Sequence, residues 1–168
     1  MNRIYLNQRR VFLLCVCLVA AGAIVVTART TARPDVKLSL TGTVQRGDKS
    51  VPLEEAGLIS PGEIISYAVI AQNAGTAPAL ALSSSTGIPQ GTVYVIGSAR
   101  ADGSARIVYS IDGGKTFHAA PMIEQRQPDG TIRQVPAPAS MYTQVRCELS
   151  EPLPPGATAT VTYQVQVR

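Results

Sequence analysis

Histidine and cysteine are scarce in this sequence, and tryptophan is missing. Histidine occurs once, at His118, and the three cysteines are Cys15, Cys17 and Cys147. A catalytic triad would therefore depend on His118 alone, and a zinc site, which needs several Cys or His ligands, has too few of them. Cys15 and Cys17 lie inside an apolar run, so a chain cleaved after that run has no second cysteine for an internal disulfide. We expect Cys147 to be a buried free thiol, with a bond to another chain or to a metal as the alternatives.

The chain also has little excess charge beyond its N-terminus. Most of the formal net charge of +4 comes from Arg3, Arg9 and Arg10. From Arg29 onward, 12 Lys and Arg stand against 11 Asp and Glu, which leaves a net charge of +1. The few aromatic residues are not interleaved with basic ones. This composition excludes the basic surface of a nucleic-acid-binding protein, and we expect no nucleic acid as a partner.

The N-terminal residues have the layout of an export signal. The three arginines precede the range 11–26, an uncharged apolar run of 16 residues, and small residues follow it. That run is shorter than the about 18–20 residues that span a bilayer, so residues 1–32 are predicted to be a cleaved signal peptide. An uncleaved signal anchor is the alternative, with the arginines on the cytoplasmic side of the inner membrane. Arg9-Arg10 resembles a twin-arginine signal, although two arginines also end ordinary export signals.

The rest of the chain is organised around the stretch 61–75. It begins with Pro61-Gly62, and Ile65, Tyr67, Val69 and Ala71 alternate onto one face, which is typical of a half-buried strand. The further strands predicted by alternation or by β-forming residues are 36–44, 79–83, 92–98, 106–110, 144–149 and 158–167.

Two of the connections between these strands carry additional predictions. The range 119–140 is rich in proline and polar residues, and 122–126 with 131–135 are predicted either to form a small exposed hairpin or to lie in one long loop. The range 45–60 is predicted to be a polar connection, in which only 53–58 could contain a helical turn. Gly42 is expected to mark a bulge in the first strand.

About seven short strands separated by turn signals predict an all-β fold. A single strand with one apolar face is not stable alone, and the other strands supply a second apolar layer. We therefore expect residues 36–168 to form one antiparallel sandwich of two sheets. An open barrel is the alternative, because alternation is the same in both.

The order of several motifs resembles a known family. Pro61-Gly62 followed by Ile65, Tyr67, Val69, Asn73 and Gly75 is similar to the bacterial conserved-repeat domain of the immunoglobulin-like class. The turns at 88–91 and 153–156 match later motifs of that family, so the resemblance covers about 36–168. Cys147 stands where the family often has a core tryptophan, and 119–140 is additional sequence. The resemblance implies an immunoglobulin-like, non-enzymatic module of secreted or cell-surface proteins, and it implies no ligand.

Few residues could carry chemistry. The range 110–117 resembles the Asp-box, a hairpin in which Ser110 and Asp112 bond backbone amides and Phe117 packs on the core. We expect it to be a structural clip, with contact to calcium or a sugar as the alternative. His118 is expected at an exposed or edge position. Three aspartates lie in separate turns, at Asp102, Asp112 and Asp129, and Glu54-Glu55 is expected in a solvated loop. We therefore predict no catalytic residue, no cofactor and no metal ion.

These observations predict an exported module of the bacterial envelope with a structural or protein-interaction role. Its partner would be a protein or the cell wall, with the membrane added if the N-terminal segment is uncleaved, and edge strands are the expected interaction surface. Its place would be the periplasm, the cell surface or the extracellular medium. A carbohydrate-binding module that uses Tyr142 or Phe117 is the second hypothesis. A hydrolase built on the Asp-box resemblance is the third.

Overall fold

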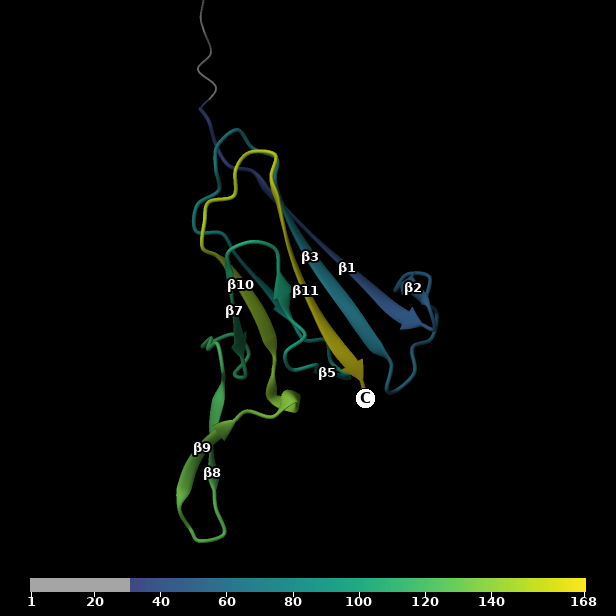
Figure 1. The fold of residues 1–168 in the computed structure, drawn as a ribbon, viewed down its shortest axis with the longest axis vertical. Coiled ribbons are helices and arrows are strands. Elements are labelled where there is room, and N and C mark those ends of the chain that lie inside the picture. The colour runs from purple at the N-terminus through teal and green to yellow at the C-terminus, as the bar shows by residue number, and fades with distance from the viewer. Residues whose placement is uncertain (1–30) are drawn as a thin grey trace, which may run out of the picture. The chain divides into compact units, whose positions relative to one another are not determined.

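Strand β3 (Ile64–Asn73) is the strand on which the larger sheet is built. The computed structural model describes residues 31–168, so the predicted signal segment lies outside the described residues except for Thr31 and Ala32. Strand β3 is paired on one side with β1 (Val36–Arg46) and on the other with β11 (Thr158–Val167), both antiparallel. These long strands run side by side in Figure 1. The prediction that 61–75 organises the chain is confirmed.

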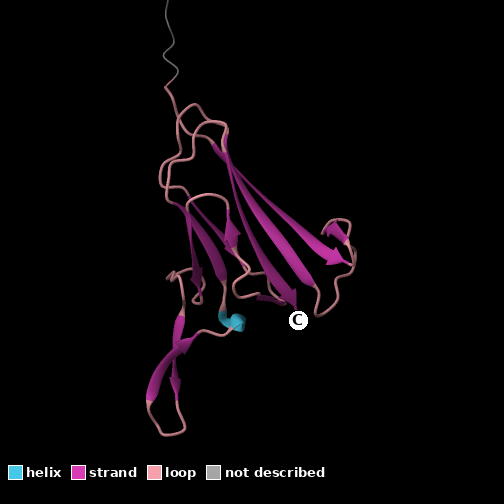
Figure 2. Ribbon diagram, viewed as in Figure 1, coloured by secondary structure: helices cyan, strands magenta, loops and turns pink. Residues whose placement is uncertain are grey.

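The other elements are shorter, and no α-helix occurs between residues 31 and 168. They are β2 (Lys49–Pro52), β4 (Ser83–Gly87), β5 (Thr92–Tyr94), β6 (Arg100–Ala101), β7 (Ala105–Ser110), β8 (Met122–Arg126), β9 (Ile132–Pro136), a 3-10 turn (Ala139–Met141) and β10 (Gln144–Leu149). Figure 2 shows strands and loops with this single helical turn. In the part of the chain described, no helix is long and apolar enough to cross a membrane.

Two antiparallel sheets make up most of the domain. The larger has the order β2-β1-β3-β11-β5, with β6 also paired to β11, and the smaller has the order β4-β10-β7. They face each other across a shared core and no described strand joins them into one sheet, which is consistent with a β-sandwich. The all-β, antiparallel class predicted from alternation is confirmed. Residues 32–168 form one compact unit.

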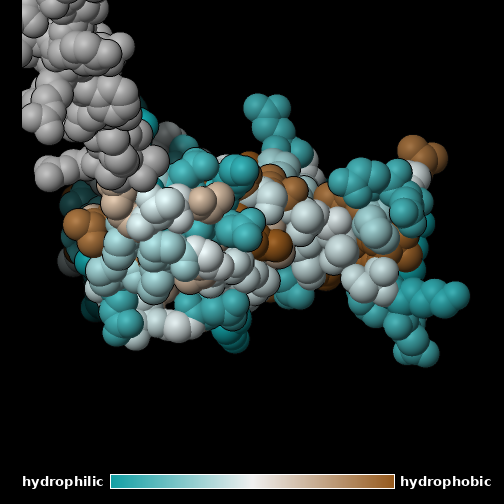
Figure 3. Space-filling view, turned by 90° about the horizontal axis from the view of Figure 1, so that it is seen from above, coloured by the Kyte–Doolittle hydropathy of each residue, from teal (hydrophilic) through white to brown (hydrophobic). Residues whose placement is uncertain are grey.

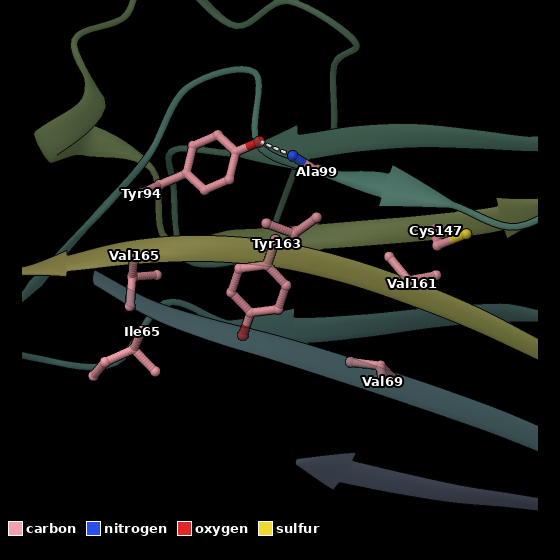
Figure 4. Packing of buried hydrophobic residues seen from close by; sticks show 9 residues of the cluster. Ile65, Val69, Tyr94, Ala99, Cys147, Val161, Tyr163 and Val165 are labelled. Atoms are coloured by element: carbon pink, nitrogen blue, oxygen red, sulfur yellow. Dashed lines mark hydrogen bonds between the residues drawn. The ribbon is translucent and has the colours of Figure 1, made fainter. Parts of the chain in front are cut away.

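The core lies between the two sheets. Figure 4 shows Ile65 and Val69 of β3, Val165 of β11 and Cys147 of β10 within one buried cluster. Tyr163, also on β11, stacks on Tyr67 with ring centroids 5.4 Å apart. Alternate positions of β11 are buried and exposed, as the period of a strand requires.

The sheets are stacked strand over strand. Tyr94 of β5 packs on Tyr109 of β7, with ring centroids 5.3 Å apart, so β7 lies over β5. A narrow apolar cavity between the sheets is lined by residues of β3 and β11 on one side and, on the other, by residues of β10, Ser84 of β4 and Leu82 just before β4. With β7 over β5, the two strand orders place β10 over β11 and β4 over β3. The smaller sheet has no described strand over β1.

Several predicted strands differ from the observed ones. The strand expected at 79–83 is wrong: Ala81 has a φ of 48°, which interrupts an extended chain, and β4 begins only at Ser83. The strand expected at 92–98 stops at Tyr94, because Ser98 donates to the carbonyl of Val95 in a turn. The range 45–60 is not a plain connection, because it contains β2 and a turn at 53–56.

Gly42 does not mark a bulge, because the pairing of β1 with β3 continues through it without interruption. Glycine at this position leaves room for two neighbouring side chains. A Cβ at this position would overlap the side chain of Leu53 and press on the ring of Tyr67. Leu53 follows β2, and its amide donates to the carbonyl of Gly42 at 3.0 Å, so the chain lies beside β1 here and the Leu53 side chain lies over Gly42.

The range 119–140 forms a projecting hairpin, of which β8 and β9 are the two strands. They pair antiparallel, which confirms the first of the two predictions for this range. The hairpin extends beyond both sheets at the lower end of Figure 1. The base is closed by buried Pro121 and Ala137, whose amide donates to the Pro121 carbonyl at 2.9 Å. We call this hairpin, residues 122–136, the arm.

Candidate functional site

The turn after β7, residues 110–117, is held together by hydrogen bonds from its own side chains, and we call it the clip. The Asp112 Oδ1 atom accepts hydrogen bonds from the Ser110 hydroxyl at 2.7 Å and from the Lys115 amide at 3.0 Å. Its Oδ2 atom accepts from the Thr116 hydroxyl at 2.7 Å. The Ser110 Oγ atom in turn accepts from the Gly114 amide at 2.8 Å. Both carboxylate oxygens are thus used inside the turn, and a cation would have to displace these donors.

These hydrogen bonds also set the charge of the clip. They favour the ionised carboxylate, and the bonds from Thr116 and Ser110 hold the pKa of Asp112 well below its usual range. A carboxylate that stays ionised at neutral pH and is satisfied by its own turn is suited to fixing the chain. It is poorly suited to proton transfer, which needs a pKa near the working pH.

Side chains of Thr143 and of β10 attach the clip to the smaller sheet. The Gly113 amide donates to the Thr143 hydroxyl at 3.1 Å, and the Gln144 side-chain amide donates to the Gly113 carbonyl at 3.3 Å. The Arg146 guanidinium carbon lies 3.5 Å from the centre of the Phe117 ring. Arg146 also donates to the Ser85 hydroxyl of β4 at 2.8 Å. The structural reading of the range 110–117 is supported by every one of these contacts.

His118 lies at an exposed position directly after the clip. It exchanges two backbone hydrogen bonds with Tyr109, which makes it part of a short bridge at the edge of β7. The hydroxyl of Ser110 donates to Asp112. The structure therefore does not bring His118 and Ser110 together as a base and a nucleophile.

The aromatic side chains named as a sugar platform are engaged in packing. Tyr142 stacks on Tyr94, with centroids 5.2 Å apart and ring planes at 23°. Tyr109 completes this group by an edge contact with Tyr142, and the Tyr94 hydroxyl donates to the Tyr109 hydroxyl at 3.1 Å. Desolvation of the half-buried ring raises the pKa of Tyr109. The flat face of Phe117 is covered by Arg146. Sugar binding by Tyr142 or Phe117 stays a prediction.

Cys147, the one cysteine among residues 31–168, is a free and buried thiol on β10. The expectation of a buried free thiol is confirmed. Desolvation, with a smaller effect from the carboxylate of Glu148, raises the pKa of the thiol. A raised pKa keeps the sulfur protonated at neutral pH, and a protonated thiol is a weak nucleophile and a weak metal ligand.

The acidic residues lie apart. Asp102 and Asp129 are in different exposed turns, and Asp129 accepts hydrogen bonds from the amide and hydroxyl of Thr131, which lower its pKa. Glu54 and Glu55 are exposed in the turn after β2. Among residues 31–168, no group of three or more His, Cys, Asp or Glu side chains could hold a metal ion.

A feature that the sequence did not indicate is an exposed apolar surface on β1. Leu38 and Leu40 pair with Ala71 and Val69 of β3, so they point to the core side of the sheet. Yet these leucines are 57% and 54% exposed, whereas Val44 on the same face of β1 is fully buried. Strand β4, the nearest strand of the other sheet, is paired only with β10 among the described strands. We call Leu38, Leu40 and the outer edge of β4 the open face.

The open face differs from the other exposed hydrophobic residues. Figure 3 shows hydrophobic side chains scattered among hydrophilic ones on the surface seen from above, which is normal for a folded protein. Leu38 and Leu40 lie next to each other on the inward side of β1, and β4, the outermost strand of the opposite sheet, pairs on one side only among the described strands. A further strand placed here would cover the two leucines and pair with the edge of β4 at the same time.

Comparisons of the chain with protein-family models, with curated proteins and with solved structures find no match.

Proposed function

We propose that the chain is an exported, immunoglobulin-like module of the bacterial envelope that binds a protein partner and catalyses no reaction. The signal pattern in residues 1–32 supports export. The two facing antiparallel sheets support an immunoglobulin-like sandwich. The residues that could carry chemistry, Asp112, Ser110 and Cys147, are committed to the clip or buried in the core.

The motifs that resemble the conserved-repeat domain come together in space. Asn73 ends the organising strand, and its side-chain amide donates to the Leu153 carbonyl at 2.9 Å. The Gly156 amide donates to the Asn73 carbonyl at 2.7 Å. The Asn-x-Gly motif and the turn before the last strand are therefore in direct contact, as the proposed immunoglobulin-like domain requires.

The observation that carries the proposed protein binding is the open face. Full burial of a leucine side chain is worth about 1.5–3 kcal/mol, so covering two half-exposed leucines is worth about the same in total. A strand added to β4 would gain backbone hydrogen bonds as well, since edge strands offer unpaired N–H and C=O groups. Such a strand would continue the smaller sheet over β1, where that sheet now has no strand.

Site-specific photo-crosslinking in living cells tests the proposed binding. Leu40 is replaced by p-benzoylphenylalanine, and Leu58, which is 94% exposed in a loop, carries the same group in the control. We expect a covalent protein adduct from position 40 and none from position 58. Equal adducts from both positions, or none from either, would contradict the open face as a binding surface.

Export is tested separately by protease accessibility. The chain is followed in whole cells, in spheroplasts and in detergent-lysed cells, with a cytoplasmic protein as the control. We expect residues 32–168 to be degraded before the cytoplasmic control. Protection equal to that of the control in spheroplasts and whole cells would place the domain inside the cell and overturn export.

A further inference from the structure

The chain enters the domain through residues 33–35, which are held by the turn after β3. The Arg33 amide donates to the Thr76 hydroxyl at 3.3 Å. The Arg33 carbonyl accepts from the amides of Thr76 and Ala77 at 2.9 Å and 3.3 Å. Both backbone polar groups of Arg33 are therefore used. We call residues 33–35 together with 73–77 the junction.

The other end of the junction is held in the same way. The Asp35 amide donates to the Asn73 side-chain oxygen at 3.2 Å, and the Asp35 carbonyl accepts from the Ala74 amide at 2.7 Å. Asn73 is fully buried and also donates to the Leu153 carbonyl at 2.9 Å. The junction is therefore complete only when the turn before β11 has joined the end of β3.

Gly75 allows the two parts of the junction to approach each other. A Cβ at this position would overlap the carbonyl oxygen of Arg33 and the amide nitrogen of Asp35. Gly75 does not belong to the glycines with a positive φ. The close approach of the entering chain, and not a special backbone conformation, is therefore what excludes a side chain here.

Two bonds near the junction follow the small residues that precede a signal-peptide cleavage site. They come after Val26-Thr27-Ala28, which lies outside the described residues, and after Thr30-Thr31-Ala32. The second bond joins Ala32 to Arg33, and its amide nitrogen is the one that donates to Thr76. An enzyme that binds its substrate as an extended strand needs the backbone groups of that strand to be free. The Ala32–Arg33 bond does not meet this need in the folded domain.

We propose that the fold protects the Ala32–Arg33 bond, so that the signal segment is removed from the folded chain only after Ala28. Cutting of a folded protein proceeds through local opening, and its rate follows the population of the open form. Opening at Arg33 breaks three hydrogen bonds of the junction. Four residues of sequence, 29–32, separate the bond after Ala28 from the junction. This inference rests on the proposed export and specifies where the signal segment is removed.

Digestion of the purified full-length chain by a bacterial signal peptidase in mild detergent tests the protection. Mass spectrometry separates a product that begins at Arg29 from one that begins after Ala32. A variant with Gly-Ser-Gly-Ser inserted between Ala32 and Arg33 moves the second bond away from the junction. We expect the unmodified chain to be cut after Ala28, and the variant to be cut after Ala32 several-fold faster than the unmodified chain. Equal rates after Ala32 in both chains, or no cut there in either, would overturn the inference.

A substitution inside the domain tests the junction directly. Gly75→Ala places a methyl group against Arg33 and Asp35, so it should raise the rate of the cut after Ala32 several-fold. Gly87→Ala is the matched control, because the nearest atom to its added Cβ is the Thr143 carbonyl oxygen at 4.0 Å. Circular dichroism shows whether both variants keep their strands, and the inserted variant alone decides if Gly75→Ala does not fold. A folded Gly75→Ala chain that is cut like Gly87→Ala would contradict the protection.

The proposed export and the protection fail in different ways. If the domain is as resistant as the cytoplasmic control in the accessibility experiment, export is wrong, and the cuts in the purified chain still decide the protection. If the domain is exported and the unmodified chain is cut after Ala32 as fast as the inserted variant, export stands and the protection is wrong. Absence of any cut after Ala28 in the unmodified chain also refutes the inference.

Discussion

At the scale of single residues, Asn73 shows how one polar side chain holds three segments together. It is fully buried at the end of β3. Its amide nitrogen donates to the carbonyls of Ala77 and Leu153, at 2.8 Å and 2.9 Å, and its oxygen accepts from the amides of Asp35 and Gly75. The chain entering β1, the turn after β3 and the turn before β11 are all fixed by these bonds.

We expect Asn73→Ala to reduce the free energy of unfolding by about 3 kcal/mol, because it leaves buried carbonyl and amide groups without partners. Gln72→Ala, at an exposed position of the same strand, is the control and should change it by less than about 0.5 kcal/mol. Urea unfolding followed by tyrosine fluorescence measures both. Equal effects of the two changes would show that the Asn73 bonds do not matter for stability.

Asp112 predicts a dependence of stability on acid. Its pKa in the folded protein is lower than in the unfolded chain, so its stabilisation is present above the ordinary aspartate pKa of about 4 and is lost as the pH falls through the folded value. Asp112→Asn should lower stability at neutral pH and weaken the decline on acidification. Asp129 and Glu63, whose pKa values are also lowered, keep part of the decline.

The measurement for Asp112 is the thermal midpoint of unfolding at a series of pH values between about 2 and 6. Asp102→Asn, in an exposed turn, is the control and should follow the unmodified protein. Parallel curves for the unmodified protein and Asp112→Asn would refute the role assigned to the clip.

At the scale of elements, the arm is separable from the sandwich. None of its residues belongs to the two buried clusters of the described domain. The ends of the arm already meet, since the Ala137 amide donates to the Pro121 carbonyl at 2.9 Å. A deletion of residues 122–136 can therefore be closed by a tight turn.

We expect the chain with Asn-Gly in place of residues 122–136 to keep its fold and to change its free energy of unfolding by no more than about 1 kcal/mol, since Asn-Gly suits a tight hairpin turn. Circular dichroism and urea unfolding measure this. A control that shortens only the tip, 127–131, should behave in the same way. Loss of the strand signal after the larger deletion would show that the sandwich depends on the arm.

At the scale of the whole molecule, the strands that alternate strictly could be predicted from the sequence. Strands β3, β10 and β11 carry apolar residues at every second position because one face of each is buried. Strand β4 could not be predicted in this way, because its sequence is Ser-Ser-Ser-Thr-Gly and its place depends on pairing with β10. Local pattern contains no information on such tertiary pairing.

The clip and the open face differ in the same way in how far they could be predicted from the sequence. The clip at 110–117 could be predicted, because its hydrogen bonds join residues no more than four positions apart. The open face could not be predicted, because Leu38 and Leu40 alternate like core residues. Their exposure follows from the number of strands in the opposite sheet, which no local pattern records.

The position of β11 has a consequence for how the protein is made. This strand is the last of the described chain to leave the ribosome, and it is inserted between β3 and β5. Until Thr158–Val167 have emerged, β3 has a neighbour on one side only, and Tyr67 has no Tyr163 to stack on. The nascent domain is therefore unable to close its main sheet before this strand is available.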